Sequence, residues 1–255
     1  MTKFLIVMII GAAFYYFLTR PVPSPAPPPG PVAATAQRAA GTARTLTPSW
    51  PPAGDEKVAV SPDLFAKNYY IVLDGSGSMA ERSCAGSKSK METAKAALAV
   101  FAQSLPANAN LGLQVFDDRG VKERLPLGTE NRDQFIRVVN QARASGGTPL
   151  RDSVAQAYAK LLEQGQKQLG YGEYHLVIVT DGEANAGQEP TAVVDRLLRD
   201  SPVVLYTIGF CIGTNHSLNQ PGRTVYKAAD NADDLRQGLS EVLAEAPQFS
   251  VTTFK

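Results

Sequence analysis

Two kinds of hydrophobic pattern alternate along the chain from residue 68 onward. One is a short apolar run rich in β-branched and aromatic residues, which is typical of buried strands. The other repeats apolar residues at intervals of three and four, which places them on one face of a helix. The strand-like runs are 68–73, 111–116, 124–127, 175–180 and 203–210, and the helix-like segments are 91–105, 131–142, 150–161, 191–199 and 233–246. This alternation predicts an α/β, doubly wound fold with a mainly parallel central sheet flanked by helices.

An unbroken apolar run, residues 4–18, stands at the beginning of the chain, with Lys3 before it and Arg20 after it. The run is short for a hydrocarbon core of about 30 Å, but long flanking side chains extend it to a tight span. We expect residues 1–20 to form an uncleaved transmembrane anchor ahead of the α/β fold. The alternative is a cleaved signal peptide, whose small-residue site would be Ala-Thr-Ala at 34–36, well past the apolar run.

The anchor and the α/β pattern are separated by a segment of biased composition. Residues 21–67 are rich in proline and alanine and have almost no periodicity, which predicts an extended, semi-rigid linker. The expected organisation is therefore an anchor over 1–20, a linker over 21–67, a domain over 68–246 and a tail over 247–255.

Composition narrows the function classes. Lys plus Arg number 25 and Asp plus Glu number 24, so the net charge of +1 gives no electrostatic footprint for nucleic acid. No basic stripe interleaved with aromatic residues is present either. Nucleic-acid binding is therefore not expected.

The candidate chemistry lies where strand-like runs end. Asp74, Ser76 and Ser78 alternate with glycines directly after the run 68–73, and Asp181 directly follows the run 175–180. The carboxyl ends of parallel strands share one edge, which is where open α/β sheets carry their ligands. Carboxylate and hydroxyl oxygens that converge in a turn suit a small hard cation.

These residues, together with Thr148, resemble the metal-ion-dependent adhesion site of von Willebrand factor type A domains. That site is written Asp-x-Ser-x-Ser, then a distant Thr and a distant Asp, and all five positions match in order over about residues 68–246. The resemblance implies that Ser76, Ser78 and Thr148 bind Mg²⁺ or Mn²⁺ through hydroxyl oxygens. It implies that Asp74 and Asp181 balance the charge, often through bound water.

The two cysteines follow strands that flank the run 175–180 in the strand order of this family. Cys84 lies in the loop after the metal motif, and Cys211 follows the run 203–210. The mouths of the two strands would be roughly 10 Å apart, which loops of this length can close. We expect one disulfide if the domain is exported, and two reduced thiols if it is cytosolic.

The resemblance implies a metal-dependent protein-binding module for adhesion or assembly, which captures an Asp or Glu of a partner protein. The apolar run 4–18 predicts that this module is membrane-anchored. Such a module is not an enzyme and takes no small-molecule substrate. We expect a single-pass protein of the cell membrane, held through residues 4–18, with its domain on the periplasmic or extracytoplasmic side. The loops 81–90 and 211–222 would frame the ion. The side chains of that rim are Glu81, Arg82, Lys88 and Lys90, of which the three cations would steer an acidic partner.

Other functions remain open. A Mg²⁺-dependent phosphatase would use Asp74 as its nucleophile, although its general acid would fall at Ser76. The segment 75–80 also fits a dinucleotide fingerprint, but no acidic residue follows at the expected distance. A metal that only stiffens the fold is a third alternative. The two histidines supply no triad, because His175 opens a buried strand and His216 lies in a polar loop without an evident partner.

Overall fold

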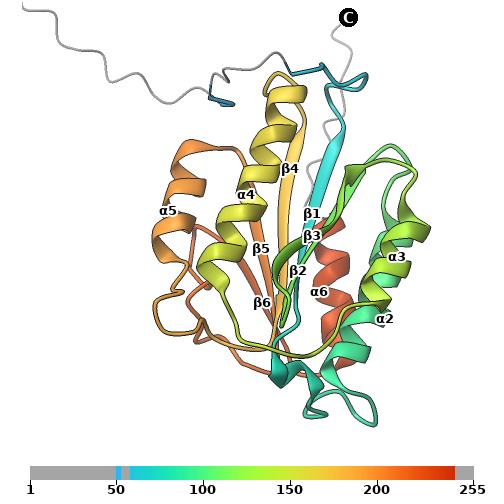
Figure 1. Cartoon of the computed structure of the whole chain (residues 1–255), viewed down its shortest axis with the longest axis vertical. Helices are drawn as coiled ribbons and strands as arrows, with labels where there is room; N and C mark the ends of the chain where they lie inside the picture. The colour runs from blue at the N-terminus through green and yellow to red at the C-terminus, as the bar shows by residue number, and fades with distance from the viewer. Residues whose placement is uncertain (1–49, 53–57, 245–255) are drawn as a thin grey trace, which may run out of the picture. The chain divides into compact units, whose positions relative to one another are not determined.

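A six-stranded sheet is the centre of the computed structural model, which describes residues 50–52 and 58–244. Its order is β3-β2-β1-β4-β5-β6, and all neighbouring strands are parallel except β2 and β3 (Figure 1). The strands are β1 (Lys67–Asp74), β2 (Asn110–Asp117), β3 (Gly120–Gly128), β4 (Glu173–Thr180), β5 (Val204–Phe210) and β6 (Val225–Ala229). The predicted mainly parallel sheet is confirmed.

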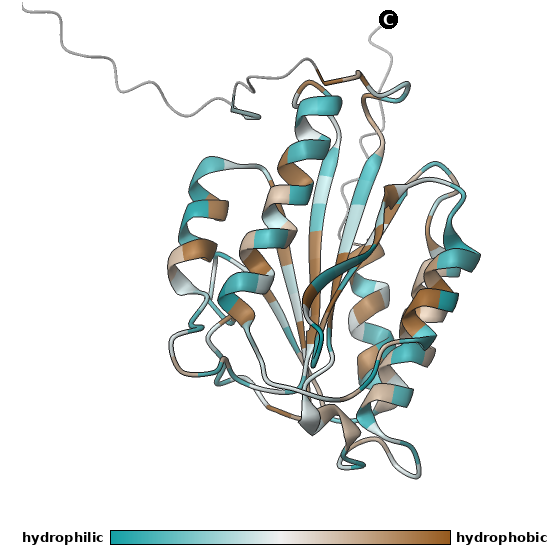
Figure 2. Ribbon diagram, viewed as in Figure 1, coloured by the Kyte–Doolittle hydropathy of each residue, from teal (hydrophilic) through white to brown (hydrophobic). Residues whose placement is uncertain are grey.

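Helices cover both faces of this sheet. One face carries α2 (Lys90–Ser104), α3 (Arg132–Asn140) and α6 (Ala232–Ala244), and the other carries α4 (Leu150–Lys167) and α5 (Thr191–Asp200) (Figure 1). The apolar sides of the helices face the sheet (Figure 2). Successive residues of β1 point to opposite faces, so Ile71 joins the core under α2, α3 and α6, and Val72 joins the core under α4 and α5. Because β1 is buried on both sides, it is a rigid support for the turn at its carboxyl end.

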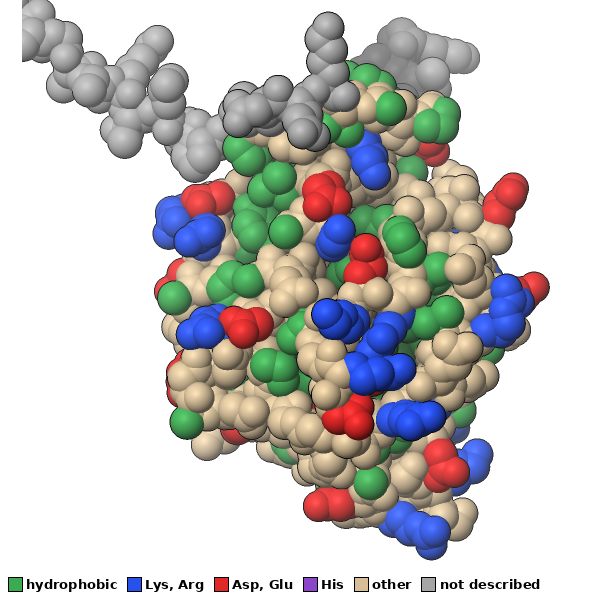
Figure 3. Space-filling view, in the orientation of Figure 1, with side chains coloured by type: hydrophobic (Ala, Val, Ile, Leu, Met, Phe, Trp, Pro, Cys, Tyr) green, Lys and Arg blue, Asp and Glu red, His purple; other side chains and the backbone are tan. Residues whose placement is uncertain are grey.

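The sheet has one strand more than the sequence pattern predicts. The pattern misses β6 because this strand is short and only half buried over most of its length, so it carries no clear apolar alternation. β3 lies at the edge, as Pro126 predicts, and its side chains Lys122, Glu123 and Arg124 are charged. Figure 3 shows Lys and Arg side chains beside Asp and Glu on this side of the domain. Charged side chains on an edge strand oppose the addition of a further strand.

Part of the predicted linker packs against the domain. The ring of Trp50 lies 5.3 Å from the ring of Tyr174 and 6.4 Å from that of Tyr158. A Cβ atom on Gly165 would come within 2.6 Å of the Trp50 ring, so the indole fits only because residue 165 has no side chain. Farther along, the amide of Ser61 donates to a carbonyl at the end of α4. The folded domain therefore includes residues before the predicted boundary at 68.

Several expectations concern residues outside the described part of the chain. The predicted anchor over 1–20, the linker up to 49 and the tail over 247–255 all lie there. Among the residues that are described, none of the helices combines the length and hydrophobicity needed to cross a membrane.

His175 is a packing residue, as predicted. It is 2% exposed, and its ring stacks on that of Tyr69 with 4.6 Å between the centroids. Burial lowers the pKa of His175, and the nearby Glu173 carboxylate offsets only part of this effect. The folded state therefore binds a proton on His175 more weakly than the unfolded state does.

This lowered pKa predicts a pH dependence of stability. As the pH falls below the unfolded value of about 6.5, the unfolded state gains a proton first and the free energy of unfolding decreases. We expect His175→Phe, which keeps a ring in the stack, to flatten this decrease. Urea unfolding of both proteins at pH values from about 5 to about 7.5 measures it. If the free energy of unfolding decreased equally with falling pH in both proteins, the assignment of this pH dependence to His175 would be contradicted.

Candidate metal centre

Asp74 ends β1 with a fully buried carboxylate. Its Oδ1 accepts a hydrogen bond from the Ser76 amide at 2.7 Å, and its Oδ2 accepts one from the Thr180 hydroxyl at 2.6 Å. Burial raises the pKa of Asp74 to about 6, although these hydrogen bonds act to lower it. Among the described residues Asp74 has no ion-pair partner. At neutral pH the site therefore holds a buried negative charge that a cation would balance.

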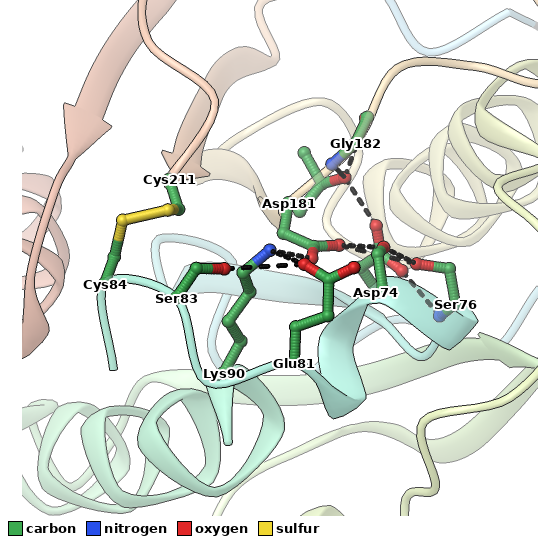
Figure 4. A network of polar contacts seen from close by, with 11 residues as sticks. Asp74, Ser76, Glu81, Ser83, Cys84, Lys90, Asp181, Gly182 and Cys211 are labelled. Atoms are coloured by element: carbon green, nitrogen blue, oxygen red, sulfur yellow. Dashed lines mark hydrogen bonds and ion pairs between the residues drawn. A yellow bond between two sulfur atoms is a disulfide. The ribbon is translucent and has the colours of Figure 1, made fainter. Parts of the chain in front are cut away.

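Three further oxygens converge beside it (Figure 4). The Ser76 and Ser78 hydroxyl oxygens are 3.0 Å apart. Asp181 Oδ1, which follows β4, lies 2.7 Å from the Ser78 hydroxyl oxygen and 3.4 Å from that of Ser76. Adjacent oxygens around an octahedral Mg²⁺ with bonds of 2.0–2.1 Å are about 2.9 Å apart. The spacing of these three oxygens is close to that geometry.

Thr148 reaches the same edge from the loop between α3 and α4. Backbone hydrogen bonds from Gly77 to Gly146 and from Ser145 to the Gly75 carbonyl hold this loop against the Asp74–Ser78 turn. Gly146 has φ of +94°, and a side chain there would meet the backbone after β2. The loop can therefore approach this closely only with glycine at that position.

The Thr148 hydroxyl faces the space beside Gly182. A Cβ atom added to Gly182 would lie 3.8 Å from the Thr148 hydroxyl oxygen and 3.9 Å from that of Ser78. Both hydroxyls thus border one small space that the missing side chain leaves clear. The structure brings all five predicted residues to one edge of the sheet.

The chemistry of this set fits a divalent cation. Two carboxylates and three hydroxyls are hard oxygen donors, which Mg²⁺ and Mn²⁺ prefer. In the described part of the chain no group of three or more His, Cys, Asp and Glu residues is suited to a metal, and the five-residue set, with only two carboxylates, is not of that class. The buried charge of Asp74 and the existing convergence of Ser76, Ser78 and Asp181 agree with a cation at this place.

Lys90 differs from the expectation that it belongs to the rim and steers an acidic partner. It is only 4% exposed, and its ammonium lies 2.8 Å from Asp181 Oδ2 and 3.1 Å from Glu81 Oε2. Burial alone would lower the pKa of Lys90, but these two carboxylates outweigh burial and raise it. A buried ammonium beside a buried carboxylate is held inside by pairing, so Lys90 does not belong to the outer rim. Glu81, Arg82 and Lys88 are exposed, as a rim requires.

A disulfide joins Cys84 to Cys211, which confirms the predicted pairing. Their Cα atoms are 5.9 Å apart, and the strands before the two loops lie on either side of β4, as the family's strand order implied. Figure 4 shows the bond beside the metal-site residues. It ties the loop after the metal motif to the loop that follows β5.

The sequence did not single out three residues that hold this edge together. Thr180 orients Asp74 by donating its hydroxyl hydrogen to the carboxylate. His216 lies 3.0 Å from the Gly182 carbonyl through Nε2, and its Nδ1 accepts a hydrogen bond from Leu218. Glu183 accepts hydrogen bonds from the amide and hydroxyl of Ser217. The contacts of His216 and Glu183 dock the loop after β5 onto the segment after β4.

A signal for Lys90 was present in the sequence. Ser89 and Glu92 form a capping box, so Lys90 is the first residue of α2. A lysine at this position is repelled by the positive end of the helix dipole. Such an unfavourable position indicates a specific anionic partner, although the pattern does not say which one.

Comparisons with known proteins identify the family and the fold of this chain. The family model described as "von Willebrand factor type A domain" matches residues 68–254, which confirms the predicted domain family. The Uncharacterized protein YwmD of Bacillus subtilis (strain 168) is 26% identical over 202 residues, which are 72% of this chain and 86% of YwmD.

Two solved structures share the fold. The conserved hypothetical protein BatB from Bacteroides thetaiotaomicron superposes with a TM-score of 0.55 at 18% identity, over 70% of this chain and 100% of that one. The PilB minor pilin from Streptococcus sanguinis gives a TM-score of 0.58 at 13% identity, over 71% of this chain and 61% of the pilin. At these identities the likeness concerns the fold alone.

Proposed function

The chain belongs to the von Willebrand factor type A domain family, and on that premise we propose that its domain is a divalent-metal-dependent protein-binding module. It captures an Asp or Glu presented by a partner protein. The observation that carries this proposal is the convergence of the Ser76 and Ser78 hydroxyls with Asp181 Oδ1. Protein interaction is a common use of this family, and a structural neighbour is named a minor pilin.

Each residue of the site has a part in this proposal. Ser76, Ser78 and Thr148 would hold Mg²⁺ or Mn²⁺, which when bound supplies a Lewis-acidic position for a carboxylate. Asp74 has a hydrogen bond to each of its oxygens, so it is suited to act as a fixed negative charge. Asp181 presents Oδ1 toward the hydroxyls and adds the second negative charge.

A phosphatase is the alternative that we favour less. Its nucleophile would be Asp74, whose carboxylate is fully buried and hydrogen-bonded on both oxygens. Two residues later, where that chemistry needs a general acid, the chain has Ser76. A hydroxyl cannot replace a carboxylic acid in protonating a leaving group at neutral pH. These features support a binding module without turnover.

The surroundings of the site bear on where the module works. We propose that Arg82 and Lys88, both exposed, steer an acidic partner toward the candidate metal site. The disulfide supports a domain on the extracytoplasmic side, because such bonds persist in oxidising compartments. Anchoring through residues 4–18 completes this proposal.

Metal binding is the first test. The full-length chain in detergent is titrated with Mn²⁺, and the free ion is followed by electron paramagnetic resonance. We expect Ser76→Ala to weaken Mn²⁺ binding at least about tenfold, since it removes a direct oxygen ligand. Ser83→Ala is the matched control, because Ser83 lies in the same loop, is exposed, and donates its hydroxyl hydrogen to the Glu81 side chain.

The outcome separates the proposals. Saturable Mn²⁺ binding that EDTA abolishes and Ser76→Ala weakens supports the module. Equal binding by both serine variants would place the metal elsewhere and contradict it. Hydrolysis of a phosphate ester that needs Mg²⁺ and disappears in Asp74→Asn would favour the phosphatase.

A further inference from the structure

The position of Lys90 is unfavourable for a positive charge in two respects. Its side chain is 5% exposed, and lysine is almost never buried unless it is paired. It also begins α2, where the helix dipole repels a positive charge. The ion pair with Asp181 must therefore compensate for both, which makes a chance contact a poor explanation.

The two oxygens of Asp181 face different partners. Oδ1 accepts a hydrogen bond from the Ser78 hydroxyl at 2.7 Å, and Oδ2 lies 2.8 Å from the Lys90 ammonium. Figure 4 shows Lys90 approaching Asp181 from the side of the disulfide, with Ser76 on the other side. The ammonium thus fixes the carboxylate while leaving the hydroxyl side to another ligand.

The charges of the site follow from this arrangement. Asp74 and Asp181 contribute two negative charges, and Lys90 cancels one of them at hydrogen-bond distance. Glu81 also contacts Lys90, but its side chain is 62% exposed, so solvent screens most of its charge. A divalent cation beside these residues is left with about one uncompensated positive charge.

We propose that Lys90 is a specificity-determining residue of the metal site, which makes tight binding of the cation depend on a carboxylate from outside. The inference rests on the proposed function. The ammonium repels the cation when it binds alone. An incoming carboxylate supplies the negative charge that Lys90 has cancelled, so the ion and the carboxylate strengthen each other's binding reciprocally. The domain therefore binds the cation weakly when the partner is absent, and it binds the partner weakly when the cation is absent.

The experiment compares three variants with the wild-type chain, full-length and in detergent. Lys90→Met removes the charge and keeps most of the side-chain length, whereas Lys90→Arg keeps the charge. Lys122→Met is the matched control, because it removes a positive charge from an exposed position on the edge strand β3, outside the proposed site. Mn²⁺ affinity is measured with sodium acetate as the carboxylate probe and with sodium chloride at equal ionic strength.

The expected result has two parts. In chloride, Lys90→Met binds Mn²⁺ about tenfold more tightly than wild type, because a nearby positive charge is gone. Acetate strengthens Mn²⁺ binding in wild type and Lys90→Arg, but much less in Lys90→Met. Lys122→Met behaves as wild type, since the charge it removes is in water.

Stability gives a readout independent of affinity. Without metal, Lys90→Met leaves the buried Asp181 carboxylate without its ion-pair partner, so the melting temperature of the variant falls. Mn²⁺ restores that partner, and the rise in melting temperature on adding Mn²⁺ is larger than in wild type. If Lys90→Met does not fold, Lys90→Gln, which can still donate to Asp181, takes its place.

Two results would overturn the inference and are distinguishable. Wild type and Lys90→Met binding Mn²⁺ with equal affinity and an equal response to acetate would refute the part assigned to Lys90 and leave the proposed function intact. Failure of every variant, wild type included, to bind Mn²⁺ would refute the proposed function and this inference together.

Discussion

Asp181→Asn is expected to abolish Mn²⁺ binding and to lower the free energy of unfolding by about 3 kcal/mol. The loss of stability arises because the substitution leaves the buried Lys90 ammonium beside a neutral amide. Glu81 still contacts that ammonium, which keeps the expected cost at the lower end for a broken buried ion pair. Urea unfolding with EDTA present measures the change without any metal contribution.

Two further variants test this reason. Adding Lys90→Met to Asp181→Asn removes the orphaned charge and is expected to recover most of the stability without recovering Mn²⁺ binding. Asp195→Asn breaks an exposed ion pair with Arg223 and should cost less than about 1 kcal/mol. If the double variant were no more stable than Asp181→Asn alone, the ion pair would not be the cause.

Loss of the disulfide is expected to have an effect of similar size. Cys84 and Cys211 are 127 residues apart, so the bond closes a long loop in the unfolded chain. We expect the double substitution to serine to lower the free energy of unfolding by about 4 kcal/mol and the melting temperature by about 10 °C. Thermal unfolding followed by circular dichroism measures the change.

The bond itself is isolated by a reductant. Dithiothreitol should lower the melting temperature of the wild-type chain by a similar amount and should leave the double serine variant unchanged. Thiol labelling of the chain extracted from its native compartment should find no reactive sulfhydryl. Two reactive sulfhydryls, or a wild-type protein indifferent to reduction, would contradict both the expected stability and the oxidising location.

The sequence predicts the position of those site residues that directly follow a strand. Asp74 and Asp181 follow buried runs that are easy to recognise, and β1 and β4 are parallel neighbours, so their ends meet at one edge. Thr148 lies in a loop without such a marker, and only the resemblance brought it to the site. The cysteine pairing likewise depended on the family's strand order, since 127 residues separate the two positions.

The features that escaped prediction depend on tertiary partners. The local sequence of Lys90 indicates at most that it needs an anionic partner, and that partner is Asp181, which is 91 residues away. Trp50 stands among prolines that indicate an extended segment, yet it packs where Gly165 leaves room. β6 is too short and too exposed for a periodic signal. For Lys90 and Trp50 the deciding contact joins segments far apart in the chain.

The position of the candidate metal site at the carboxyl end of β1 has a mechanical consequence. The described chain enters the sheet at Lys67 and leaves β1 at Asp74, so the entry into the sheet and the candidate site lie at opposite ends of one central strand. If the proposed anchor over residues 4–18 holds the chain, tension between that anchor and a bound partner would pull along β1. The hydrogen bonds that join β1 to β2 and β4 on both sides would then be loaded in shear, and many must break together. Geometry of this kind resists force better than strands peeled apart one bond at a time.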